Sequence, residues 1–298
     1  EVIGLRLVFS TTYGVGSGVG NGSMIHLYRS SAGCTTVKAD GVTNPLPGFD
    51  VDELFQQADP LAWLEGALDG AAAGELHDRA WSPPIGSQEV WAAGVTYFQS
   101  RSARMEESEA SGGDRFYDMV YEADRPEIFF KATAPRVRGH LDQIRVRADS
   151  TWDVPEPELT LAINSAGKVF GATIGNDVSS RSIEGENPLY LPQAKVYRGS
   201  CALGPALVVG AVLEPEVKIK VQIERGGESV FAGATDLGQI KRGFDELAEF
   251  LFRENEFPVG AYLMTGTGVV PGADFSLTSG DIVHIEIDGL GRLSNAVE

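Results

Sequence analysis

Two carboxylates stand two residues apart in the segment VPEPELTLAI (154–163), where a strand is expected to begin. Side chains alternate between the two faces of a strand, so Glu156, Glu158 and Thr160 share one face. The residues of the other face are apolar: Leu159, Leu161 and Ile163. Two like charges on a half-buried surface raise each other's pKa unless a cation lies between them. The pattern therefore indicates either a cation-binding pair or a strand end whose two carboxylates face water.

A third carboxylate, Asp177, ends the segment ATIGND further along the chain. The residues Ser-Ala-Gly-Lys (165–168) predict a turn that joins the two strands in a hairpin. A hairpin returns the end of its second strand to the start of its first, so we expect Asp177 beside Glu156 and Glu158. Three converging carboxylates form an oxygen site that suits Mg²⁺, Mn²⁺ or Ca²⁺.

The elements that must position these groups are mostly strands. From Glu127 onward, short runs rich in β-branched and aromatic residues alternate with Gly, Pro, Asn or Asp. One helix is expected at 240–255, where apolar residues recur at helical spacing. The pattern predicts an α+β protein with antiparallel or mixed sheets and disfavours a Rossmann fold. The expected strands are 127–133, 143–148, 158–164, 169–179, 206–210, 217–225, 228–235, 261–267 and 281–287.

Residues 1–84 read as a small N-terminal α/β domain that ends near the turn SPPIGS, and residues 85–298 as the catalytic domain. Within the first part, 50–68 predicts two short helices separated at Pro60. The glycine-rich stretch 14–22 lacks the G-x-G-x-x-G and G-K-[ST] patterns, so a loop is favoured over a phosphate-binding site.

The polar segment 100–123 predicts a helix, a break at two glycines and a second helix. A broken helical segment between strands is a candidate lid over an active site. An ordinary helical hairpin that faces solvent is the alternative.

Composition limits the partners. The chain has 298 residues, of which 43% are hydrophobic, 42 are acidic and 24 are basic. The resulting formal charge of -18 disfavours nucleic acid and anionic membranes as partners. Apolar runs long enough to span a membrane and a secretory leader pattern are both missing, so the sequence predicts a cytoplasmic protein. The 2 cysteines and 4 histidines show no metal-ligand spacing, so oxygen ligands are expected for any metal.

Several motifs occur together in order: PEPELTLAIN, GATIGNDVSSRS, QAKVYRGSCALGP, LMTGTGVVPG and GDIVHIEIDGLGRLSNAV. From Trp91 to the C-terminus the chain resembles the fumarylacetoacetate hydrolase superfamily. This resemblance implies a β-sandwich roll, usually dimeric, in which Glu156, Glu158 and Asp177 ligate a divalent metal. The metal would bind a 2-oxo acid through its carboxylate and keto oxygens.

Further segments, GVTYFQSR, VYEADRPEIFFKAT and ENPLYLPQAKVY, resemble a dehydratase subgroup that acts on 2-keto-3-deoxy sugar acids such as 2-keto-3-deoxy-D-arabinonate. The resemblance implies that Glu127 and Lys195 are the acid/base pair and that Thr267 contacts the substrate carboxylate. Ser100 and Arg101 are the candidate substrate contacts from the lid segment.

Hydrolases of the family typically carry a His-Glu pair that activates water, but here Ser100 and Ala103 occupy those positions. Hydrolysis is therefore disfavoured. Dehydration needs a base for the proton on carbon 3 and an acid for the hydroxyl that leaves carbon 4. Lys195 suits the base if burial lowers its pKa, and Glu127 the acid if an apolar shell keeps it protonated, although the roles could be reversed.

The sequence thus predicts a magnesium-dependent hydro-lyase that converts a 2-keto-3-deoxypentonate to 2,5-dioxopentanoate. Three carboxylates and a divalent cation leave a net negative site, so Lys195 and one of Arg181, Arg198 or Arg101 would offset that charge. One alternative is a hydrolase or decarboxylase of acylpyruvates or oxaloacetate. Another is a catalytically silent protein that binds a metal or a sugar acid.

Overall fold

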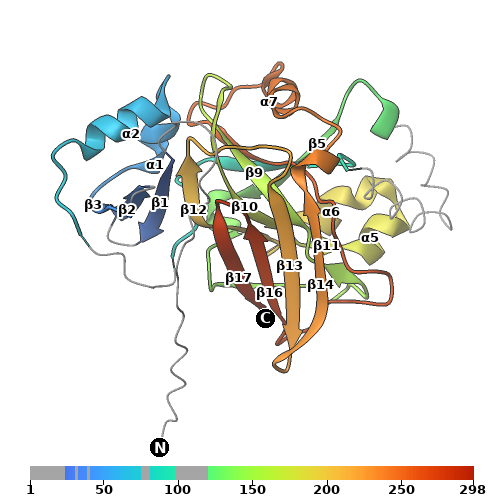
Figure 1. The fold of residues 1–298 in the computed structure, drawn as a ribbon. Coiled ribbons are helices and arrows are strands. Elements are labelled where there is room, and N and C mark those ends of the chain that lie inside the picture. The colour runs from blue at the N-terminus through green and yellow to red at the C-terminus, as the bar shows by residue number, and fades with distance from the viewer. Residues whose placement is uncertain (1–23, 31–32, 39–40, 75–80, 98–119) are drawn as a thin grey trace, which may run out of the picture.

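The computed structural model describes residues 24–30, 33–38, 41–74, 81–97 and 120–298. In these residues two large mixed sheets pack face to face (Figure 1). Most strand pairs are antiparallel, and the parallel pairs are β15 with β4, β12 with β6 and β17 with β7. The expectation of antiparallel or mixed sheets is confirmed. Within these ranges, no helix has the length and apolar character needed to cross a membrane.

The ten-stranded sheet has the order β3-β2-β1-β12-β10-β9-β15-β4-β5, with β6 paired to β12. It carries every strand that contributes to the carboxylate cluster. Its strands are β1 (Ile25–Ser30), β2 (Gly33–Lys38), β3 (Thr43–Leu46), β4 (Glu89–Gly94), β5 (Glu127–Thr133), β6 (Val137–Arg138), β9 (Pro157–Ile163), β10 (Val169–Asp177), β12 (Cys201–Val209) and β15 (Ala261–Met264).

The five-stranded sheet has the order β14-β13-β16-β17-β7. Its strands are β7 (Gln143–Ile144), β13 (Lys218–Arg225), β14 (Glu228–Asp236), β16 (Ile282–Ile287) and β17 (Gly291–Val297). A short ribbon pairs β8 (Asp153–Val154) with β11 (Ser179–Ser180). The expected strand at 143–148 is much shorter than predicted, and β17 was not predicted at all.

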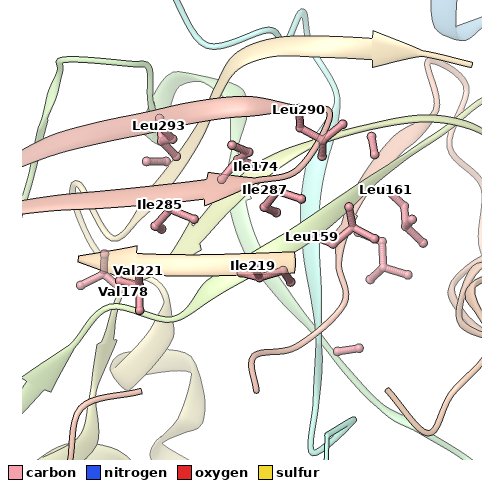
Figure 2. Packing of buried hydrophobic residues seen from close by; sticks show 14 of the residues in the cluster. Leu159, Leu161, Ile174, Val178, Ile219, Val221, Ile285, Ile287, Leu290 and Leu293 are labelled. Atoms are coloured by element: carbon pink, nitrogen blue, oxygen red, sulfur yellow. The ribbon is translucent and has the colours of Figure 1, made fainter. Parts of the chain in front are cut away.

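The main core lies between the two sheets, where apolar side chains from both inner faces meet (Figure 2). Leu159 and Leu161 of β9 contribute from one sheet, and Ile219 of β13 and Ile285 of β16 from the other. Residues that enter this core alternate along each strand with residues of the other face, because one face of each sheet packs inward, as in other sandwiches. The predicted division of β9 into an apolar face and a carboxylate face is confirmed on its apolar side.

The N-terminal strands continue the large sheet, since β1 pairs with β12 and Ile25 lies opposite Val209. Two helices, α1 (Val51–Phe55) and α2 (Pro60–Leu68), follow them, as expected. Pro60 is the first residue of α2, a position where its missing N–H costs nothing. The division of the chain at residue 84 into two domains stays a prediction.

Three helices follow residue 127 where one was expected: α5 (Arg181–Glu186), α6 (Leu191–Lys195) and α7 (Phe244–Phe252). Helix α7 is shorter than the predicted 240–255 because the chain enters the helix at Gly243. Helices α5 and α6 are too short to show a helical repeat in sequence. Single 3₁₀ turns occur at η2 (Ala134–Arg136), η3 (Pro188–Tyr190) and η4 (Leu237–Gln239). Most of the candidate lid, and the loop 14–22, lie outside the described residues.

Candidate metal and active site

The site is built on the hairpin of β9 and β10. The strands are antiparallel, and Gly175 lies opposite Glu158. The backbone N–H of Asp177 donates to the carbonyl of Glu156 at 3.0 Å, which brings the end of β10 to the start of β9. The predicted hairpin is confirmed, with Gly167 at φ +80° in its turn.

The three predicted carboxylates converge. One oxygen from each of Glu156, Glu158 and Asp177 lies within 4.8 Å of the others. Their exposed fractions are 1%, 2% and 1%, so a strand end whose carboxylates face water is wrong. A buried group of three acids needs compensating charge.

Each carboxylate has a protein partner on at least one of its oxygens. Arg181 Nη2 donates to Glu156 Oε1 at 2.7 Å, and the Gly266 N–H donates to Glu158 Oε2 at 2.7 Å. Lys131 forms an ion pair with Asp177 Oδ1. The contacts fix the orientation of all three groups, as a metal site requires of its ligands.

Lys195 lies in the centre of the cluster. It is the last residue of α6, its side chain is 1% exposed, and Nζ lies 2.5 Å from Glu156 Oε2 and 3.0 Å from Asp177 Oδ2. The ammonium also stands 5.4 Å from the ring centre of Phe129, a cation–π contact. Lys195 is therefore a buried member of the cluster.

The cluster combines opposed buried charges. Burial, followed by the charges of Asp177 and Glu156, raises the pKa of Glu158 well above its ordinary value. The three carboxylates face three buried cations, Lys131, Arg181 and Lys195. The clustered carboxylate oxygens are the hard ligands that a divalent ion such as Mg²⁺ prefers.

A cavity of about 170 Å³ opens on this cluster, enough for several waters or a small ligand. Its charged side is formed by Glu156, Glu158, Asp177, Arg181 and Lys195. The rest of the lining is mostly apolar or glycine: Ala93, Gly94, Val95, Phe129, Gly266, Thr267, Gly268, Val269 and Val270. A small anion with a carbon chain matches this division between charged and apolar walls.

Of the remaining predicted residues, some lie at the cavity and others do not. Thr267 lines the cavity, and its hydroxyl donates to the carbonyl of Val269 at 3.1 Å. Glu127 lies opposite Gly94, which lines the cavity, so closely that a Cβ on Gly94 would meet Glu127 Oε2 at 1.8 Å. Arg181 is in the cluster, whereas Arg198 is exposed. Ser100 and Arg101 lie outside the described residues.

Sequence reasoning missed Lys131 and Gly266. A lysine inside the apolar strand EIFFKAT, with Phe130 before it and Ala132 after it, was the available signal for a buried charge. Gly266 adopts φ +90°, where a Cβ would lie 2.0 Å from Thr96 Oγ1. Only glycine therefore presents its N–H to Glu158 at that turn.

Known proteins are similar to this chain in sequence. A dehydratase named for 2-keto-3-deoxyxylonate ("probable") from Haloferax volcanii is 50% identical over 222 residues, 74% of this chain and 75% of its own length. A 2-dehydro-3-deoxy-D-arabinonate dehydratase from Saccharolobus solfataricus is 43% identical over 227 residues, 75% of this chain and 76% of the relative. An oxaloacetate tautomerase from Bacillus subtilis is 29% identical over 62% of this chain and 66% of its own length.

A solved structure of 2-keto-3-deoxy-D-arabinonate dehydratase complexed with magnesium and 2,5-dioxopentanoate superposes with a TM-score of 0.77. The identity is 32%, over 93% of this chain and 99% of the other. The expected sandwich roll is thereby confirmed. The family model described as fumarylacetoacetate hydrolase C-terminal matches residues 103–298, and the chain belongs to the fumarylacetoacetate hydrolase family.

Proposed function

We propose that this protein is a hydro-lyase that uses a divalent metal to dehydrate a 2-keto-3-deoxy sugar acid. The observation that carries the proposal is the buried contact between Lys195 and the carboxylates of Glu156 and Asp177 at the charged side of a cavity. The relatives named for this reaction, at 43% and 50% identity, support the same assignment.

Glu156, Glu158 and Asp177 are the proposed ligands of Mg²⁺, with Mn²⁺ and Ca²⁺ as alternatives. Their support is the 4.8 Å cluster of oxygens, the raised pKa of Glu158 and the magnesium in the related structure. When bound, the metal supplies a Lewis acid that stabilises negative charge on the keto oxygen of a 2-oxo acid.

Lys195 and Glu127 are the proposed acid/base pair. One removes a proton from carbon 3 while the other protonates the hydroxyl that leaves carbon 4 as water. Lys195 lies inside the cluster, where it reaches a substrate held at the charged side. Glu127 lies beside Gly94, which lines the cavity, and this proximity supports its proposed role.

The proposed substrate is 2-keto-3-deoxy-D-arabinonate. Loss of water from carbons 3 and 4, followed by tautomerisation that converts the terminal hydroxymethyl carbon to an aldehyde, gives 2,5-dioxopentanoate. Thr267 is proposed to contact the substrate carboxylate, because it lines the cavity next to the turn that holds Glu158. Ser100 and Arg101 are proposed as further substrate contacts on the basis of the family resemblance. That resemblance also supports a homodimer, which light scattering after gel filtration would test.

The test is a proton NMR time course with Mg²⁺ and 2-keto-3-deoxy-D-arabinonate. We expect an aldehyde signal from the product, its loss in EDTA and its return when Mg²⁺ is restored. Oxaloacetate and an acylpyruvate serve as parallel substrates, because one relative is named an oxaloacetate tautomerase. Release of pyruvate from the acylpyruvate, without turnover of the sugar acid, would refute the dehydratase assignment.

A further inference from the structure

Lys131 is a buried cation of the cluster to which the proposed reaction gives no part. Its side chain is 0% exposed. Nζ donates to the carbonyl oxygens of Val178 at 3.0 Å and Lys195 at 2.6 Å, and pairs with Asp177 Oδ1. The ammonium is thus held by two hydrogen bonds and one ion pair.

A β-bulge directs this side chain. The register of β4 and β5 places Val90 opposite Ala132 but Trp91 opposite Phe130. Lys131 therefore has no partner residue on β4 and is the extra residue of the bulge. Bulges interrupt regular pairing and redirect side chains, often next to active sites. Here the redirected side chain reaches the end of β10 and the end of α6.

The contacts of Lys131 divide the two oxygens of Asp177. Oδ1 pairs with Lys131, while Oδ2 lies 3.0 Å from Lys195 Nζ. The same ammonium holds the main-chain oxygen of Lys195. One buried charge thus fixes both the rotation of a carboxylate and the helix end that carries the candidate base.

We propose that Lys131 is a positioning residue that leaves Asp177 one oxygen for a divalent cation and keeps Lys195 aligned with that oxygen. This inference rests on the proposed function. Without the charge of Lys131, both oxygens of Asp177 become available and the site gains one unit of negative charge. A divalent cation then binds more tightly, while the alignment needed for proton transfer is lost.

Tighter metal binding together with slower turnover separates this role from simple stabilisation of the fold. The test variant is Lys131→Met, which keeps an unbranched side chain only one atom shorter and removes its charge. Binding of Mn²⁺ to the metal-free protein is measured from the electron paramagnetic resonance signal of free Mn²⁺, and kcat and KM are measured at saturating Mn²⁺. The control is Ile223→Ala, a fully buried position in β13 of the other sheet.

For Lys131→Met we expect the Kd for Mn²⁺ to fall about threefold or more, because the site has become more negative. We expect kcat to fall about tenfold or more with KM little changed, because proton transfer depends on alignment. Ile223→Ala should lower stability while its Kd and kcat stay within about twofold of the wild type, since the core loses volume but no charged group changes.

A Lys131→Met protein that binds Mn²⁺ no more tightly than Ile223→Ala, or that keeps the kcat of the wild type, would overturn the proposal. If Lys131→Met does not fold, Lys131→Gln replaces it, because its amide still donates to the carbonyl oxygens of Val178 and Lys195. The Kd for Mn²⁺ and the kcat of that variant then test the proposal in the same way. Mn²⁺ binding needs no substrate, so a wild type that binds Mn²⁺ but turns over no sugar acid refutes the proposed function alone.

Discussion

The candidate site and the outer face of the five-stranded sheet both place lysines beside acids, but in opposite surroundings. In the site, the side chains of Lys195 and Glu156 are 1% and 2% exposed. On the outer face, those of Lys220 and Glu286 are 50% and 48% exposed. Water screens the second pair, so it contributes little to stability. The first pair is buried, so the loss of one partner leaves the other charge poorly solvated, and the charges of the cluster depend on one another.

The two regions also shift carboxylate pKa values in opposite directions. A hydrogen bond from Lys218 lowers the pKa of Asp236 on the outer face. Burial raises the pKa of Glu158 in the site despite the nearby Lys195. Ionisation of the surface acid stabilises the folded state, whereas ionisation of the buried acid destabilises it. Strongly shifted pKa values of this kind are common at functional sites, where a bound ligand stabilises the ionised group.

The largest difference between the regions should appear in turnover. Lys195→Met should lower kcat by about 10³-fold, because it removes a proposed acid/base group and the cation between Glu156 and Asp177. The matched surface variant Lys220→Met should leave kcat unchanged. Steady-state kinetics on 2-keto-3-deoxy-D-arabinonate makes the comparison. A Lys195→Met enzyme that retains most of the wild-type kcat would remove the lysine from the mechanism.

A backbone comparison comes next in size. Gly266 and Gly280 adopt nearly the same φ, +90° and +92°, but a Cβ meets Thr96 Oγ1 at 2.0 Å in the first and nothing within 4 Å in the second. Gly280→Ala should cost about 1 kcal/mol from backbone strain alone. Gly266→Ala should cost about 2–4 kcal/mol because a clash adds to the same strain.

Urea unfolding of the metal-free proteins measures both costs. Gly266→Ala should also weaken Mn²⁺ binding, since its N–H orients Glu158, and Gly280→Ala should not. Equal free energies of unfolding for the two variants would mean that the turn at Gly266 adapts without loss.

A smaller effect concerns pH. Since the folded-state pKa of Glu158 lies above the ordinary value of 4.5, the metal-free fold is favoured below that value and loses stability as pH rises toward the folded pKa. Glu158→Gln removes this loss. The variant should therefore gain stability over the wild type as pH rises above about 4.5, although it loses activity.

Asp236→Asn serves as the opposite case. Because the pKa of Asp236 in the folded state lies below its ordinary value of 3.8, this residue stabilises the fold at pH values above 3.8. The contribution is lost as the pH falls through the folded-state pKa. The variant should be slightly less stable than the wild type at neutral pH and equal to it in strong acid. Urea unfolding of both metal-free variants across the pH range checks the two slopes, and slopes of the same sign would contradict the assignment.

The smallest effect is expected at the exposed pairs themselves. Lys220→Met should change the free energy of unfolding by about 0.5 kcal/mol or less, and added salt should reduce the difference further. The free energy of unfolding of the wild type should rise with salt, because salt screens the repulsion among the charges of a chain with a formal net charge of -18. Unfolding curves at low and high NaCl would show both, and a wild type that loses stability in salt would contradict the second expectation.

The carboxylate cluster was predictable from sequence because it depends on short-range rules. The alternation of Glu156 and Glu158 and the hairpin that returns Asp177 to them need only a strand period and a turn. The contact of Lys195 with the cluster followed from the family resemblance, since nothing near it in sequence indicates a buried position.

Lys131 and the helices α5 and α6 were beyond those rules. The role of Lys131 depends on a bulge whose position is visible only in the pairing of β4 with β5. Helices α5 and α6 gain their stability from packing rather than from a repeated apolar pattern. Strand β17, GRLSNAV, carries too few β-branched or aromatic residues to indicate a strand by itself, and it forms because β16 offers it an open edge.

The most direct test of the contrast between the two regions is an anomalous diffraction map from a crystal soaked in Mn²⁺. The account predicts one strong peak bonded to the carboxylates of Glu156, Glu158 and Asp177, with Lys195 Nζ moved away from at least one of its two acid partners. The acids of the outer sheet face should show no comparable peak. A map with Lys195 still in contact with both acids, and Mn²⁺ only on the surface, would contradict it.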